Sequence, residues 1–352
     1  MRRAESWRVL VAGLLALLAS GAPADPPGYE LGRGLRLPAL DLTLAGYASA
    51  RARDLEQRPP RFDLHDLSLF IIWSPTARWT VFSEIELEDV VTVDQRGPNA
   101  SDTELVVERL YADYAVDGRF NLRAGRWLTP FGRWNLLHAD PLVWTVTRPL
   151  VTSLAIPDHG TGVMAYGSVP IGADSVDYSL YLDDSAALDP VDAEASFEEF
   201  DLGGLANNFD QAAGALLRYR FLALRAELGL SWASFSIDRQ RGHQHAIGVD
   251  GIVHHGRFEL SSELVYRVNT RAGVRDDWGG FIQAVAPLVD TLYGVGRVEF
   301  YSSGLIGDDA GRTSAGLAWR PHRALVFKLE YHDGTNARIL PDGWEVSCGV
   351  LF

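Results

Sequence analysis

The charged side chains best suited to handling an ion or a polar solute lie in or beside one segment of the sequence, residues 128–158. They are Arg126, Arg133, Arg148, His138, Asp140 and Asp158. A guanidinium group can hold a carboxylate or a phosphate through two parallel hydrogen bonds, and a narrow passage of low dielectric constant strengthens that attraction. The alternative is that these arginines anchor the segment to neighbouring carboxylates, such as Glu84, Glu86 or Asp113.

The same segment is unusually apolar for a loop. Its apolar side chains are Trp127, Phe131, Trp134, Leu136, Leu137, Leu142, Val143, Trp144, Leu150 and Leu154. So many apolar groups require burial. Four prolines between positions 130 and 157 also stiffen the chain. We therefore expect residues 128–158 to fold into an interior and to narrow it.

Charged residues also recur at every second position along the apolar stretches of the chain. For example, Leu325, Phe327 and Leu329 alternate with Lys328 and Glu330. A period of two predicts a β-strand with one apolar face. The polar face of such strands supplies a candidate wall for a lumen: Arg109, Arg123, Arg218, Arg225, Arg297, Lys328, Glu84, Glu86, Glu227 and Glu299.

The connections between these strands alternate between short and long. Seven short turns lie near residues 74–77, 117–118, 170–172, 222–223, 255–256, 287–290 and 321–323. Eight long loops lie at 54–61, 91–103, 128–158, 184–207, 237–244, 268–276, 302–311 and 333–342. Sixteen strands follow, and this regularity is typical of an all-β, transmembrane antiparallel β-barrel with short periplasmic turns and long extracellular loops. The competing architecture is a secreted β-sandwich or propeller, whose strands also alternate.

Composition excludes several classes of function. The chain has 32 basic and 46 acidic residues, a formal net charge of −14, which disfavours a nucleic-acid partner. Its single cysteine excludes an intramolecular disulfide and a zinc site built on several thiolates. Two histidine pairs, 243/245 and 254/255, are expected at opposite ends of the barrel, so no metal site and no cofactor are predicted.

One long loop is strongly acidic. Residues 183–201 contain eight carboxylates and no basic residue. This loop could concentrate cations at a pore entrance or bind Ca²⁺ or Mg²⁺ through carboxylate oxygens, or it could be a solvated surface loop.

The N-terminus has the features of a cleaved secretory signal. Arg2, Arg3 and Arg8 precede an apolar run from Val9 to Ala19, and small residues follow near Ala24. The run is too short to span a bilayer, which needs roughly 20 apolar residues. We expect a signal peptide at 1–24, a periplasmic N-terminal segment at 25–38 and the barrel at 39–352, with loop 128–158 folded inward.

Two stretches carry a resemblance to known proteins. Trp344, Val346, Cys348, Val350 and Phe352 form an alternating apolar row that ends in an aromatic residue, which resembles the assembly signal of bacterial outer-membrane proteins. The segment from Leu122 to Asn135, with the pattern R-x-G-x-x-x-x-P-F-G, resembles porins of the phosphate-selective (porin O/P) type. The resemblance implies recognition by the barrel-insertion machinery and assembly into a homotrimer.

These observations predict an outer-membrane porin of a Gram-negative-type envelope, not an enzyme. It would give small hydrophilic or anionic solutes a water-filled diffusion path, surrounded by outer-membrane lipid and lipopolysaccharide. Two alternatives remain open. One is a plugged barrel with a binding or structural role. The other is an outer-membrane hydrolase with acidic and histidine residues at the rim, such as Asp158 with His159, Asp276 with Asp277, or Asp308 with Asp309.

Overall fold

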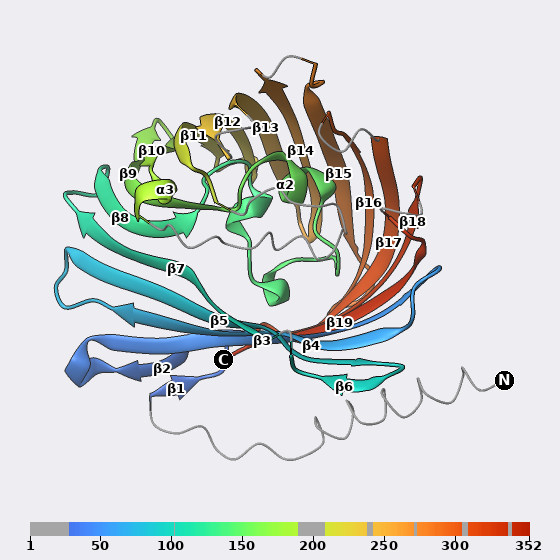
Figure 1. The fold of residues 1–352 in the computed structure, drawn as a ribbon. Coiled ribbons are helices and arrows are strands. Elements are labelled where there is room, and N and C mark those ends of the chain that lie inside the picture. Colours follow the sequence, from blue (N-terminus) through green and yellow to red (C-terminus); the bar gives the residue numbers. More distant parts are fainter. Residues whose placement is uncertain are drawn as a thin grey trace.

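The structure is a computed structural model that describes residues 28–101, 103–188, 208–237, 242–270, 273–304, 309–336 and 340–352. The expected signal peptide (1–24) and most of the acidic loop (from 189 to 201) lie outside the described residues. Within the described residues, sixteen long strands form one antiparallel sheet that curls into a barrel, seen in Figure 1.

The long strands follow one another around the barrel in sequence order. They are β3 (Leu42–Leu55), β4 (Arg61–Trp73), β5 (Trp79–Asp94), β7 (Glu104–Ala115), β8 (Asn121–Leu128), β9 (His159–Ile171), β10 (Asp174–Asp183), β11 (Gln211–Phe221), β12 (Ala226–Ser236), β13 (His243–His255), β14 (Phe258–Asn269), β15 (Asp277–Pro287), β16 (Leu292–Ser302), β17 (Asp309–His322), β18 (Leu325–Gly334) and β19 (Gly343–Leu351). Every neighbouring pair is antiparallel, as short turns between successive strands require.

The barrel closes between its first and last long strands. β19 pairs with β3 from Gly343 opposite Leu55 to Leu351 opposite Tyr47. Beyond that point the short β2 (Gly34–Leu37) takes over the same edge of β3, and β1 (Tyr29–Glu30) pairs with β2. The 3-10 helix η1 (Pro38–Leu40) then leads into β3. Closure pairs the backbone amides and carbonyls at both edges of the sheet, which is required of a sheet inside a bilayer.

The alternation of short turns and long loops is confirmed. Each of the eight long connections expected from the sequence joins two consecutive strands of the barrel within a few residues of the expected bounds. The loop after β5 also holds the short strand β6 (Gly97–Asn99), which pairs with the end of β5. One predicted wall residue is misplaced: Arg225 lies in the turn before β12, exposed and with φ of 51°, because β12 begins only at Ala226.

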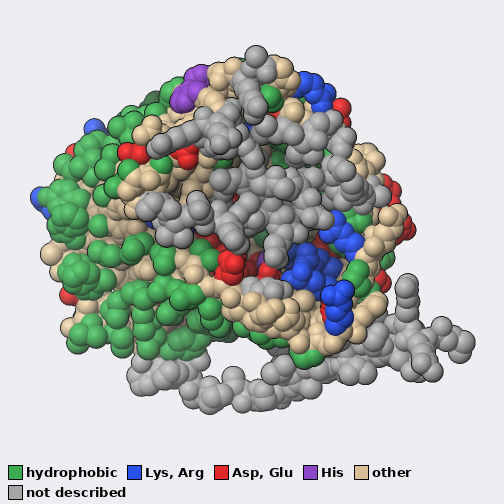
Figure 2. Space-filling view, viewed as in Figure 1, with side chains coloured by type: hydrophobic (Ala, Val, Ile, Leu, Met, Phe, Trp, Pro, Cys, Tyr) green, Lys and Arg blue, Asp and Glu red, His purple; other side chains and the backbone are tan. Residues whose placement is uncertain are grey.

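The apolar alternates point outward. Leu228, Leu230 and Trp232 of β12 are about half exposed, whereas Ser231 between them is buried. The same holds on β14, where Leu260, Leu264 and Tyr266 are exposed while Ser261 and Glu263 are buried. Figure 2 shows a broad hydrophobic outer face on the side of β5, β7 and β8. Such a surface suits lipid, and the polar alternates line the interior.

Among the described residues, no helix is long and apolar enough to cross a membrane.

Because Leu264 faces outward near the middle of β14, we expect Leu264→Arg to destabilise the folded barrel in a bilayer by about 2–4 kcal/mol. The same change at Leu224, in the turn before β12, should cost roughly 0–1 kcal/mol because the turn lies at the edge of the apolar band. Denaturant unfolding in vesicles measures both values. Equal costs at the two positions would contradict the assignment of the apolar band.

Candidate functional site

The loop between β8 and β9 lies inside the barrel. In Figure 1 it crosses the space enclosed by the strands, and it contains the 3-10 helices η2 (Trp134–Leu136) and η3 (Asp140–Leu142) and the short helix α2 (Leu150–Ala155). We call residues 129–158 the inner loop. Helix α2 packs against β14, β15 and β16, while η3 reaches β19 and β3.

Apolar side chains hold part of the inner loop against the wall. Trp134 meets Phe281 of β15 edge to face, with 6.1 Å between ring centroids. Leu150 and Leu154 are buried in the same cluster. Leu142 is the exception among the apolar loop residues, being half exposed. The unusual apolarity of the segment is therefore explained by burial inside the barrel.

Wall carboxylates accept hydrogen bonds from the backbone of the inner loop. Glu330 of β18 accepts from the amides of Val146 (2.7 Å) and Thr147 (3.2 Å) and from the Thr147 hydroxyl (2.6 Å). Glu299 of β16 accepts from the amide of Leu150 at 2.6 Å, at the N-terminus of α2. A carboxylate there also complements the helix dipole.

Wall cations donate hydrogen bonds to the backbone carbonyls of the inner loop, just as wall carboxylates accept hydrogen bonds from its amides. Arg267 of β14 donates to the carbonyls of Leu154 and Ala155 at the C-terminal end of α2, at 3.3 and 2.9 Å. Arg320 of β17 donates to two further loop carbonyls, at 2.9 Å each. Other wall cations that bind the loop are Arg218, Arg297, Arg312 and Lys328. The loop thus depends on wall side chains for partners that it does not supply itself.

Glycines allow the loop to approach the wall closely. A Cβ at Gly349 of β19 would lie 2.8 Å from Pro141 of η3. Gly132, with φ of 65°, faces the carboxylate of Glu263 so closely that a side chain there would overlap it. Larger residues at either position would push the loop into the lumen.

The structure places three of the predicted constriction residues in anchoring roles. Arg133 pairs with Glu227 of β12. Asp140 is buried and pairs with Lys328 at 2.7 Å, and although burial opposes ionisation, the Lys328 ammonium holds the pKa of Asp140 below its ordinary value. Arg148 lies near the loop carbonyls of Leu137 and Trp134, at 3.5 and 3.4 Å.

The other three predicted constriction residues, Arg126, His138 and Asp158, lie nearer β7, β8 and β9. Arg126 of β8 donates to the side-chain oxygen of Asn208 at 3.0 Å. Burial raises the pKa of Asp158, whose side chain has Arg148 nearby. His138 lies between two wall carboxylates. Burial alone would lower the pKa of His138, but Glu108 and Glu86 raise it to about 10.

Most predicted wall residues do face the lumen, and most are paired. Arg123 forms a bidentate pair with Asp113, at 2.8 and 2.9 Å, and stacks over the ring of Tyr111. Other wall pairs join Arg109 to Glu84, Arg218 to Asp250 and Arg297 to Glu299.

Several lumenal residues were missed by the sequence analysis. Arg51 and Arg53 of β3 continue the inward row of Tyr47 and Ser49, and Arg53 pairs with Asp63 at 3.1 Å. Both arginines alternate with alanines along the sequence, and this pattern would have predicted a strand with the arginines on its polar face. Glu108 of β7 escaped because a β-bulge opposite Glu84 shifts the register at that point. Further lumenal residues missed are Arg61, His65 and Arg312.

In the lumen, many carboxylates are buried, whereas many arginines are partly exposed to water. Glu84, Glu86 and Glu108 are no more than 1% exposed. Partly exposed carboxylates remain at positions such as Asp113 and Glu227. The partly exposed lumenal cations include Arg51, Arg53, Arg61, Arg109, Arg123, Arg133 and Arg148. Among the described residues, buried lumenal carboxylates outnumber the buried lumenal cations, which are Arg218, Arg267, Arg297, Arg312 and Lys328.

The rim pairs proposed for catalysis are engaged in structural contacts. His159 is buried and pairs with Glu108, and Asp277 is buried and pairs with Arg267. Asp276 accepts a hydrogen bond from Tyr266, while Asp308 lies outside the described residues. The histidine pairs 243/245 and 254/255 stand at opposite ends of β13, as expected.

Comparison with known proteins supports the fold. No family model matches the sequence. An uncharacterized protein of Aquifex aeolicus is 30% identical over 166 residues, which cover 46% of this chain; the matched part is about a third (34%) of the length of that relative.

Solved outer-membrane proteins match over nearly their whole length. An anion-selective porin from Comamonas acidovorans aligns with a TM-score of 0.58 and 14% identity, covering 88% of this chain and 99% of that one. OmpF of Salmonella typhi aligns with a TM-score of 0.60 and 11% identity, covering 90% of this chain and 99% of OmpF. The outer-membrane channel DcaP of Acinetobacter baumannii aligns with a TM-score of 0.56 and 11% identity, covering 91% of this chain and 100% of DcaP. The chain has the porin fold.

The pair of Asp140 with Lys328 gives a test of loop anchoring. Lys328→Met removes the ammonium that pairs with the buried Asp140 carboxylate, so we expect a loss of about 3–5 kcal/mol in stability. Adding Asp140→Asn should recover most of that loss, since the uncompensated charge is then removed. Unfolding in detergent micelles measures both variants. Equal losses in the single and double variants would show that the pair does not act as a unit.

Proposed function

We propose that this protein is an outer-membrane diffusion channel for small hydrophilic solutes, with a preference for anions. The observation that carries the proposal is the combination of a closed sixteen-stranded barrel with a lumen where arginines are partly exposed and most carboxylates are buried. Sixteen strands enclose more space than their own side chains fill, and the inner loop narrows that space.

The charge distribution supports the anion preference despite the net charge of −14. Many lumenal carboxylates are used to hold the inner loop, so they present little charge to a solute. Arg51 lies on the wall near Asp140 of η3, where the inner loop approaches β3, and Arg53 follows on the same face of the strand. One protein of similar fold is named as an anion-selective porin. A preference for phosphate among anions is the finer proposal, drawn from the segment at Leu122–Asn135.

The proposal includes the cellular setting. Export would use the signal peptide at 1–24, and insertion would use the row of Trp344, Val346, Cys348, Val350 and Phe352, which is lipid-facing along β19. Assembly as a homotrimer is proposed because a porin-fold neighbour, OmpT of Vibrio cholerae, is described in a trimer form.

A plugged barrel is the second candidate, and one observation favours it. The inner loop contacts the wall on opposite sides of the lumen. His138 lies beside Glu86 of β5, while Arg267 of β14, eight strands further around the barrel, donates to the carbonyl of Ala155. A chain that crosses the lumen in this way leaves less room for a water path. The two candidates differ in whether the folded barrel conducts.

Planar-bilayer recording of the purified protein decides between them. We expect stable ohmic single-channel steps in KCl, because the lumenal arginines stay accessible to water. Folded, heat-modifiable protein that gives no steps would reject the channel and favour the plugged barrel.

The anion preference has its own test in a KCl gradient. We expect Arg51→Ala combined with Arg53→Ala to shift the reversal potential toward cations, because it removes two lumenal cations. Arg257→Ala, in the turn between β13 and β14, is the matched control and should shift it less. An unchanged reversal potential in the double variant would remove these arginines from the selectivity-determining wall.

A further inference from the structure

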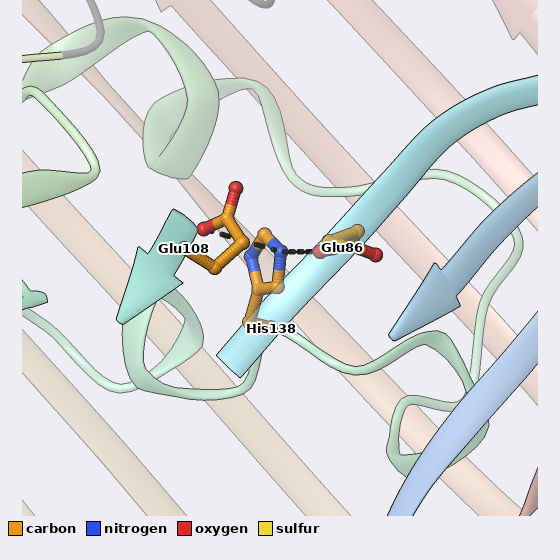
Figure 3. A group of neighbouring side chains, drawn as sticks. All are labelled: Glu86, Glu108 and His138. Atoms are coloured by element: carbon orange, nitrogen blue, oxygen red, sulfur yellow. Dashed lines mark ion pairs between the residues drawn. The ribbon is translucent and has the colours of Figure 1, made fainter. Parts of the chain in front are cut away.

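Three metal-ligating side chains from different parts of the fold converge where the inner loop meets the wall. Glu86 comes from β5, Glu108 from β7 and His138 from the inner loop, and Figure 3 shows their side chains directed toward one another. His138 Nε2 lies 3.4 Å from Glu86 Oε2 and 3.7 Å from Glu108 Oε2. One donor atom from each residue lies within 4.8 Å of the others.

One oxygen at this cluster is buried and lacks a hydrogen bond. Glu86 accepts from the Tyr47 hydroxyl through Oε1, at 2.9 Å, which fixes the orientation of the carboxylate. Its second oxygen, Oε2, is buried and receives no hydrogen bond, yet it points at the imidazole of His138. Leaving a buried carboxylate oxygen without a hydrogen-bond donor is costly, and the ion pair with His138 at 3.4 Å offsets that cost only in part, so this oxygen can accept a closer cationic partner.

Two of the three distances between the donor atoms fit a small divalent cation. Zinc binds imidazole nitrogen and carboxylate oxygen at roughly 2.0–2.2 Å, so tetrahedral ligands around it lie about 3.4 Å apart. The two separations measured from His138 Nε2 are close to that value. Carboxylate and imidazole donors together suit zinc and related transition metals better than calcium, which takes oxygen ligands only.

We propose that Glu86, Glu108 and His138 bind a divalent transition-metal ion such as Zn²⁺, which fastens the inner loop to the β5–β7 wall. The two carboxylates balance the charge of the ion, and His138 serves as a neutral ligand. When no metal is bound, a proton on His138 can hold the same two carboxylates by ion pairing.

The surroundings of the cluster also suit a metal site. Ligand side chains are normally held by outer hydrogen bonds, and here Tyr47 binds Glu86 and His159 binds Glu108. The His138 side chain is 22% exposed, whereas Glu86 and Glu108 are almost fully buried, so His138 gives the site access from the lumen. The fourth position would be taken by water from that side.

Equilibrium dialysis against Zn²⁺ tests the proposal on the untagged, chelator-stripped full chain in detergent. We expect about one high-affinity Zn²⁺ per chain, and at least a tenfold loss of affinity in His138→Gln and in Glu86→Gln. His255→Gln, which changes an exposed histidine at the end of β13, is the matched control and should leave the affinity unchanged. Co²⁺ in place of Zn²⁺ should give the visible absorption of a tetrahedral site in the wild type and lose it in His138→Gln.

Three results would overturn the proposal. They are no uptake of Zn²⁺ by the wild type, equal uptake by the wild type and both folded site variants, or binding of Ca²⁺ as tight as that of Zn²⁺. Heat-modifiable mobility on gels verifies that each variant is folded, and if one fails to fold, the other carries the test. None of these measurements depends on conduction, so the metal site and the channel function can fail independently.

Discussion

The backbone of the inner loop must find hydrogen-bond partners inside the barrel, and the rest of the interior is organised around that requirement. A chain without regular structure, removed from bulk water, would otherwise leave amides and carbonyls unsatisfied at a high free-energy cost. The strands supply the partners through their inward side chains. Glu299 and Arg267 illustrate this at the two ends of α2, one accepting from the first amide and the other donating to the last carbonyls.

This use of wall charges explains how an acidic protein can expose arginines in its interior while many of its lumenal carboxylates are buried. Carboxylates that accept amides from the loop are withdrawn from the solute, whereas arginines with long side chains reach past their partners and keep part of the guanidinium exposed. Net charge therefore says little about the field inside the lumen. The relevant quantity is the exposed charge of each sign along the narrowed path.

The sequence predicted the barrel well because period-two alternation and alternating connection lengths are local signals. The apolar content of 128–158 likewise predicted burial of that segment. The partners of its charges could not be predicted, since the pairing of Asp140 with Lys328 depends on how far η3 crosses the lumen. Glu108 was hidden by a β-bulge, and Arg225 was misassigned because the turn extends two residues further than the alternation suggested.

The ladder between β3 and β19 also has a consequence for biogenesis. The strands that seal the barrel are its first and last long strands, and Phe352 forms backbone hydrogen bonds with Gly46 in both directions. Contacts between such distant parts of a chain form late, because loop closure must come first. Until β19 arrives, the growing sheet carries two open edges that can pair with other chains. A stalled or truncated precursor is thus an aggregation hazard, and rapid capture of the last strand is a condition of productive folding.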